Sequence, residues 1–277
     1  MTSVFPLREF ALAVAGEGAE VKCILPPGAG IHTWQPRPSD IGKLYASDLF
    51  IFIGARLEPW AGDILQSLSG RKVNILEVSR FLTLLKAEEE DHGHEAEAGH
   101  GAVDPHVWLD FEYDQVIVRR IQEALTELVP SSSVTFQSNA ETYIRKLRNL
   151  DELYKKELGS CPRRTFILGG HAAFGYLARR YNLRQVSLYG LSPDAEPVPS
   201  QLIGIINLAR QESLKAVYFE SNVNAKLAKV LAQEIQAKIL KLNPGHNISQ
   251  EEIARGVTFL ALMEQNLKAL KEGLGCE

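Results

Sequence analysis

The alternation of short apolar runs with amphipathic stretches is the feature of this sequence that most constrains its fold. Apolar or β-branched runs bounded by turn residues predict buried strands at 21–25, 49–54, 73–77, 165–168, 216–219 and 238–242. Helices are predicted between them over 59–68, 200–212 and 225–236. Strands that alternate with helices form mostly parallel sheets with helices on both faces, so the expected fold class is α/β.

The alternation is interrupted between residues 111 and 158, where two predicted helices follow each other without a strand. The second helix, over 133–158, carries one apolar stripe with steps of three and four residues: Tyr143, Leu147, Leu150 and Tyr154. Its length suits a rigid strut between two lobes, and a chain of 277 residues usually fills more than one core. We therefore expect an N-terminal α/β lobe over 1–130, a linking helix over 131–159 and a C-terminal α/β lobe over 160–277. One large domain covered by a long helix is the alternative.

Composition narrows the possible functions. The formal net charge is −4, which offers no basic face to nucleic acid, and the longest apolar run, 49–55, is far shorter than the ~20 residues that cross a bilayer. The first residues lack the charged and apolar regions of a signal peptide, so either the protein is cytosolic or a targeting segment has been removed. The cysteines, Cys23, Cys161 and Cys276, allow at most one disulfide.

Residues 86–103, KAEEEDHGHEAEAGHGAV, form a second departure from the pattern. This segment contains six carboxylates, three histidines (His92, His94 and His100) and no large apolar residue before Val103. It cannot bury enough surface to offset the entropy of ordering, so we expect a mobile loop of the N-terminal lobe.

Histidines outside this loop are the candidate ligands for a metal. His32 follows a Pro/Gly-rich turn after the first predicted strand, His106 precedes the helix that begins near 111, and His171 follows a strand and two glycines. Ligands of open α/β sheets collect beyond the carboxyl ends of strands. Neutral imidazole suits Zn²⁺, and three imidazoles with one further ligand complete a tetrahedron. Motifs of helical zinc proteases, nucleophile-elbow hydrolases, phosphate-binding loops and dinucleotide-binding folds are absent from the sequence.

Five ordered segments resemble the cluster A-I metal-binding proteins of ABC transporters, the receptors for zinc and manganese uptake. They are Leu25-Pro26-Pro27-Gly28 with His32 and 35–40; Leu57-Glu58-Pro59-Trp60; 104–110, which contains His106; 171–176, which begins at His171; and 191–197. The resemblance runs from about Val4 to Leu274. It implies two α/β lobes joined by one long rigid helix, with a metal ion held between them.

The resemblance implies that His32, His106 and His171 are metal ligands. Members of the zinc type have His at the third position, where manganese-type members tend to have Glu, so His171 points to zinc. The acidic loop over 86–103 also resembles the zinc type, in which it would collect Zn²⁺ weakly; a solvated spacer is the alternative.

One position departs from the family pattern. Many members have an Asp as fourth ligand in a Leu-Asp-Pro segment, where this chain has Leu242-Asn243-Pro244. A water molecule, Glu220, Asn243 or His246 is left for the fourth position, with His246 expected to be a surface loop residue. Three imidazoles without a carboxylate would leave the charge of a divalent ion almost uncompensated, which disfavours Mn²⁺.

The sequence thus predicts a non-enzymatic, monomeric Zn²⁺ receptor outside the cytoplasm, periplasmic or membrane-anchored, that delivers the ion to the membrane permease of an ABC importer. The alternatives are a manganese or iron receptor of the same fold, a zinc hydrolase with Glu220 as general base, and an adhesin that uses metal structurally.

Overall fold

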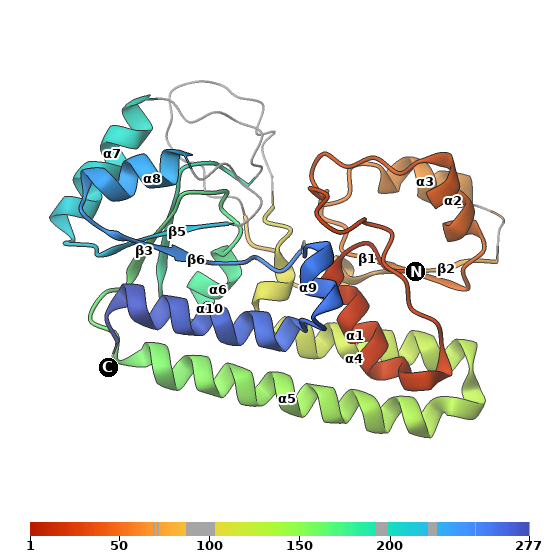
Figure 1. The fold of residues 1–277 in the computed structure, drawn as a ribbon. Coiled ribbons are helices and arrows are strands. Elements are labelled where there is room, and N and C mark those ends of the chain that lie inside the picture. The colour runs from red at the N-terminus through yellow and green to blue at the C-terminus, as the bar shows by residue number, and fades with distance from the viewer. Residues whose placement is uncertain are drawn as a thin grey trace.

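The computed structural model describes residues 1–68, 70, 72–86, 103–191, 199–220, 226–246 and 248–276. Two α/β lobes lie side by side over a layer of long helices (Figure 1). Both contain parallel sheets with flanking helices, so the predicted fold class is confirmed. Within the described ranges, no helix has the length and apolar character needed to cross a membrane.

The N-terminal lobe is built on the parallel pair β1 (Leu49–Phe52) and β2 (Asn74–Glu77). Thr2 adds isolated parallel bridges to Cys23 and Ile51, which extend this sheet by two short segments. The predicted strand at 21–25 is therefore wrong as a full strand and reduces to the bridge at Cys23. The helices α2 (Pro38–Tyr45) and α3 (Ala61–Leu68) belong to this lobe.

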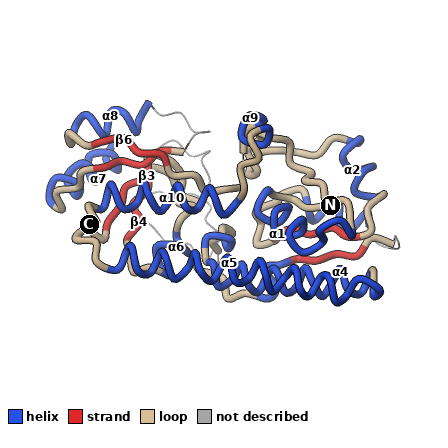
Figure 2. Tube along the Cα trace, turned by 60° about the horizontal axis from the view of Figure 1, so that its bottom comes forward, coloured by secondary structure: helices blue, strands red, loops and turns tan. Residues whose placement is uncertain are grey.

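The C-terminal lobe holds a four-stranded parallel sheet in the order β4-β3-β5-β6. Its elements are β3 (Thr165–Leu168), α6 (Gly175–Arg180), β4 (Arg184–Ser187), α7 (Pro199–Gln211), β5 (Ala216–Phe219), α8 (Lys226–Glu234) and β6 (Lys238–Lys241). The short helix α9 (Gln250–Ala254) follows β6 in the chain but lies beside the N-terminal lobe (Figure 2). Sequence analysis missed β4, whose residues RQVS form a polar edge strand without an apolar run.

Four helices form the layer beneath the lobes: α1 (Phe5–Ala15), α4 (Phe111–Leu128), α5 (Ser133–Gly159) and α10 (Phe259–Leu274). The 27 residues of α5 make a rod about 40 Å long. It runs alongside α4 beneath the N-terminal lobe and continues beneath the C-terminal lobe (Figure 2). All four residues of its predicted stripe are buried, which confirms the helix and its orientation.

A continuous core joins the two lobes beyond the linking helix. Phe10 of α1 packs edge-on against Phe259 of α10, with ring centroids 5.1 Å apart. The same ring lies 5.7 Å from that of Tyr143 in the middle of α5. Because α1 and α10 contact each other directly, the lobes share packed side chains as well as a covalent connection.

A partly buried ion-pair network connects α5 to α6 and to the N-terminal end of α4. Arg180 of α6 donates to both carboxylate oxygens of Asp151 in α5 at 2.6 Å and lies 3.0 Å from Asp110, the N-cap of α4. Burial alone would raise the pKa of Asp151, but the hydrogen bonds from Arg180, Lys155 and Tyr181 outweigh it and lower the pKa to about 2.

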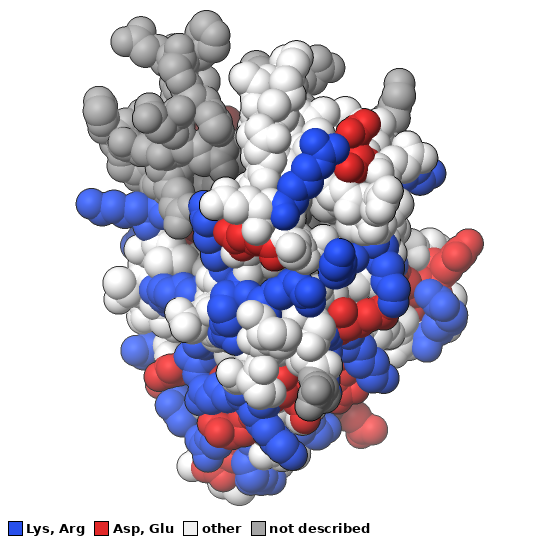
Figure 3. Space-filling view, turned by 90° about the vertical axis from the view of Figure 1, so that its left-hand side faces the viewer, with Lys and Arg blue, Asp and Glu red and all other residues white. Residues whose placement is uncertain are grey.

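Charge on the surface is of mixed sign. Lys and Arg side chains intermingle with Asp and Glu over the face of the molecule in Figure 3. Exposed ion pairs of the C-terminal lobe include Arg210 with Glu234 and Lys238 with Glu272. This face therefore presents no uniformly basic surface of the kind that nucleic acid requires.

Arg180→Ala should destabilise the protein by about 3 kcal/mol, because it removes the cation that the buried carboxylates of Asp110 and Asp151 share and leaves them only the more exposed Arg179 and Lys155. The matched control is Arg184→Ala, which removes an exposed pair with Glu212 and should cost under about 1 kcal/mol. Urea denaturation of both variants measures the difference, and equal losses would contradict this role of Arg180.

Asp114→Asn should stabilise the protein at pH 8 and lose this advantage towards pH 4. Both carboxylate oxygens of Asp114 are buried and find no hydrogen-bond partner within the described residues. Burial and the nearby charge of Asp110 raise the pKa of Asp114 well above its ordinary value. A raised pKa means that the wild type loses stability as pH rises from the unfolded value near 4 through the folded one.

Thermal melts at several pH values test this expectation, with Asp63→Asn in the exposed first turn of α3 as the control. A pH-independent difference between Asp114→Asn and the wild type would show that the charge of Asp114 is not the cause.

Candidate metal centre

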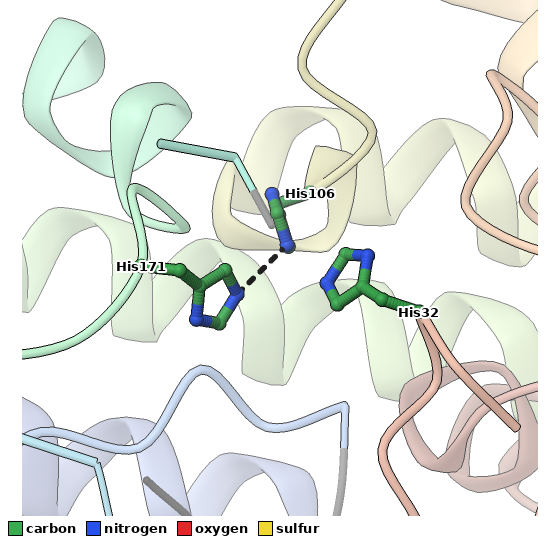
Figure 4. A group of neighbouring side chains, drawn as sticks. All are labelled: His32, His106 and His171. Carbon is green, nitrogen blue, oxygen red and sulfur yellow. Dashed lines mark hydrogen bonds between the residues drawn. The ribbon is translucent and has the colours of Figure 1, made fainter. Parts of the chain in front are cut away.

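Three predicted histidines converge at the junction of the lobes. His32 comes from the N-terminal lobe, His171 from the C-terminal lobe, and His106 from the segment that leads into α4 (Figure 4). One ring nitrogen from each residue lies within 4.8 Å of the others. His106 and His171 are buried, whereas His32 is half-buried.

The carboxyl ends of two neighbouring strands bring His171 and Glu220 together. His171 follows β3 after two glycines, Glu220 follows β5 directly, and β3 pairs with β5 in parallel. The Oε1 atom of Glu220 accepts from the backbone N–H of His171 at 3.0 Å and lies 2.8 Å from its ring Nδ1. Gly170 makes this contact possible, since a Cβ atom there would collide with the Glu220 carboxylate.

Asp104 supports His106 in the same way. Its Oδ1 accepts from the backbone N–H of His106 at 2.9 Å and lies 2.8 Å from the ring Nδ1. Burial raises the pKa of Asp104 to about 7 and, together with the neighbouring His171, lowers the pKa of His106 well below its ordinary value. The role of Asp104 was not predicted, although the segment Asp104-Pro105-His106 places a hydrogen-bond acceptor two residues before the candidate ligand.

The rings of His106 and His171 face each other through their Nε2 atoms. Because each carboxylate oxygen already accepts a backbone N–H, each Nδ1 is the ring donor and each Nε2 carries a lone pair. The two Nε2 atoms lie 3.2 Å apart (Figure 4). Imidazole nitrogens bound to tetrahedral Zn²⁺ at about 2.0–2.1 Å lie about 3.3 Å apart, so the pair has the spacing of two zinc ligands.

The Pro/Gly-rich turn positions His32. Thr33 and Trp34 both donate backbone N–H groups to the carbonyl of Gly30, which folds the chain tightly around His32. Gly28, with φ of +80°, donates to the carbonyl of Ile248 and so connects the turn to the chain just past His246. The ring of His32 lies 5.5 Å from that of His106 and 5.3 Å from that of His171.

The candidates for the fourth ligand position differ in whether their side chains already make hydrogen bonds. Glu220 is engaged with His171, and the side-chain oxygen of Asn243 accepts from the backbone N–H of Gly245 at 2.8 Å. The expectation that His246 lies on the surface is wrong, because the residue is only 7% exposed and its ring packs against the three other rings.

Two predicted features lie outside the described residues. Of the acidic segment 86–103, the structure describes only its ends, Lys86 and Val103, which form an isolated antiparallel bridge. Of the segment 191–197, it describes only residue 191.

Comparisons with known proteins identify zinc-binding relatives of this chain. The chain is 34% identical to the zinc-binding lipoprotein AdcA of Streptococcus pneumoniae over 98% of its length and 55% of the relative. It is 33% identical to the high-affinity zinc uptake system protein ZnuA of Bacillus subtilis over 99% of this chain and 86% of the relative. The chain therefore spans about half the length of the AdcA relatives that it matches.

A solved structure gives the same correspondence in three dimensions. The Zn(II)-bound ZnuA-like domain of Streptococcus pneumoniae AdcA superposes with a TM-score of 0.83 at 32% identity, over 99% of this chain and 97% of that domain. Two α/β lobes on a long helix define a solute-binding protein of the cluster A-I class. Within it, the family described as zinc-uptake complex component A, periplasmic (ZnuA), matches residues 1–273, and the chain belongs to this family.

Glu220→Gln should lower the affinity for Zn²⁺ by about 10–100-fold, because the amide loses the charge that polarises the Nδ1–H group of His171. Glu234→Gln is the matched control, since Glu234 is exposed and pairs only with Arg210 among the described residues. Competition with a chromogenic zinc chelator measures both affinities. An unchanged affinity in Glu220→Gln would show that this hydrogen bond does not tune the ligand.

Proposed function

We propose that this protein is a zinc receptor of an ABC importer, in which His32, His106 and His171 capture one Zn²⁺ ion between the lobes. The observation that carries the proposal is the 3.2 Å separation of two carboxylate-backed Nε2 atoms, with a third ring nitrogen within 4.8 Å. The names of the relatives support zinc as the ion.

The donor chemistry favours zinc over manganese or iron. The clustered side chains offer imidazole nitrogen, which suits Zn²⁺, whereas Mn²⁺ prefers carboxylate and water. Each of the two nearby carboxylates, Asp104 and Glu220, uses one oxygen to accept a hydrogen bond from a histidine ring. The same engagement of Glu220 weakens the alternative of a zinc hydrolase, which needs a general base beside a metal-bound water.

The proposed place of action is outside the cytoplasm, in a periplasm or anchored to a membrane. The bond between Cys161 and Cys276 supports this location, because structural disulfides persist in oxidising compartments. The partner in this proposal is the membrane permease of the importer, which takes the ion from a monomeric receptor.

We further propose that the lobes 1–130 and 160–277 move little about the linking helix 131–159. The packing of Phe10 on Phe259 supports this, since hinge opening would separate these rings. Release of the ion would then come from local rearrangement around half-buried His32 or the segment 86–103.

Calorimetric titration of chelator-stripped protein should show one tight Zn²⁺ site that excess Mn²⁺ does not displace. His106→Ala should weaken this site at least about 100-fold, because it removes a ligand and opens the pair with His171. Ready displacement by Mn²⁺, or tight zinc binding that survives in His106→Ala, would contradict the proposal.

A variant lacking residues 88–101 separates the acidic segment from this site. This variant should keep the tight Zn²⁺ site and lose only weaker Zn²⁺ sites.

A further inference from the structure

His246 is a buried histidine that the three-ligand arrangement does not use. It is 7% exposed, and its Nδ1 atom is buried without a hydrogen-bond partner in the part of the chain that the structure describes. A buried ring nitrogen normally binds a donor, an acceptor or a metal ion. The buried Nδ1 atom of His246 departs from this rule.

The ring of His246 closes the histidine cluster on its open side. Its centroid lies 5.6 Å from that of His171, 6.0 Å from His32 and 6.2 Å from His106. Four imidazoles around tetrahedral Zn²⁺ place their centroids about 5 Å apart, so His246 stands about 1 Å outside the ideal position. His246 lies outside the group of three residues whose ring nitrogens fall within 4.8 Å of one another, so its ring has to move towards the other three to bind the same ion.

The turn that carries His246 is held by contacts to the site. It follows the carboxyl end of β6, the strand next to β5, and so lies beside Glu220. The side chain of Asn243 accepts from the backbone of Gly245, and the carbonyl of Pro244 accepts from the indole N–H of Trp108 at 2.6 Å. Since Trp108 lies two residues after His106, the two histidines are positioned by one connected unit.

Charge balance is consistent with a fourth neutral ligand. Zn²⁺ with four neutral imidazoles carries two positive charges, which would be costly in a buried site. The side chains of Asp104 and Glu220, each 2.8 Å from a histidine ring, place up to two negative charges beside the cluster. The site therefore needs no carboxylate among its direct ligands.

We propose that His246 is the fourth ligand and that the site binds Zn²⁺ through four imidazole nitrogens, with Nδ1 of His246 making the last bond. This inference rests on the proposed function. The competing arrangement has a water molecule as fourth ligand, hydrogen-bonded to His246.

X-ray absorption spectroscopy of the full chain with one equivalent of Zn²⁺ distinguishes the two arrangements. The wild type should show the outer-shell multiple scattering of four imidazoles, and His246→Gln should show that of three imidazoles with one oxygen donor in the first shell. Competition with a chelator should give a loss of at least about 100-fold in His246→Gln. His246→Glu, which restores a donor, should recover part of the affinity and reduce the preference for Zn²⁺ over Mn²⁺.

Three imidazoles and one oxygen in the wild type would overturn the assignment of His246, while tight zinc binding would leave the proposed function intact. A wild type that binds no Zn²⁺ tightly would overturn both. The wild-type spectrum decides the question even if His246→Gln does not fold.

Discussion

The contact between the inner nitrogens of His106 and His171 is the interaction on which the site depends. Two Nε2 atoms at 3.2 Å need a proton or a metal ion between them, because two neutral rings that both carry the proton on Nδ1 would face each other with lone pairs. Neither ring can turn away easily, because Asp104 and Glu220 hold both its ring Nδ1 and its backbone N–H. Ligands that are already held in place bind an ion more tightly, because less ordering is needed on binding.

The rest of the architecture serves to keep these two rings fixed. His171 belongs to the C-terminal sheet and His106 to the segment ahead of α4, so any relative motion of these elements would separate them. Arg180 joins α6, α5 and the N-cap of α4 through its ion pairs with Asp151 and Asp110. The packing of α1 on α10 adds a second connection. A hinge opening would break both sets of contacts, which explains why a long helix and a shared core suit this kind of receptor.

Sequence patterns predicted the parts of the structure that depend on local periodicity. The histidines at 32, 106 and 171 stood out because they follow strand ends or precede a helix, and the stripe on α5 because its helix is amphipathic. The helix α1 escaped prediction since it is apolar on most sides and has no clear period. The burial of His246 could not be predicted either, because it depends on the hydrogen bond between Trp108 and Pro244, which are 136 residues apart.

Placing the carboxylates behind the histidines has a consequence for selectivity. A carboxylate bound directly to the metal favours hard ions such as Mn²⁺, whereas a carboxylate that accepts from a ligand ring makes that imidazole a stronger donor without offering oxygen to the metal. In the proposed site, Asp104 and Glu220 would therefore balance the charge of the ion through the rings of His106 and His171. The replacement of a conventional acidic ligand by Asn243, whose side chain holds the turn at Gly245, is compatible with tight binding for this reason. The negative charge is retained, and only its distance from the metal has changed.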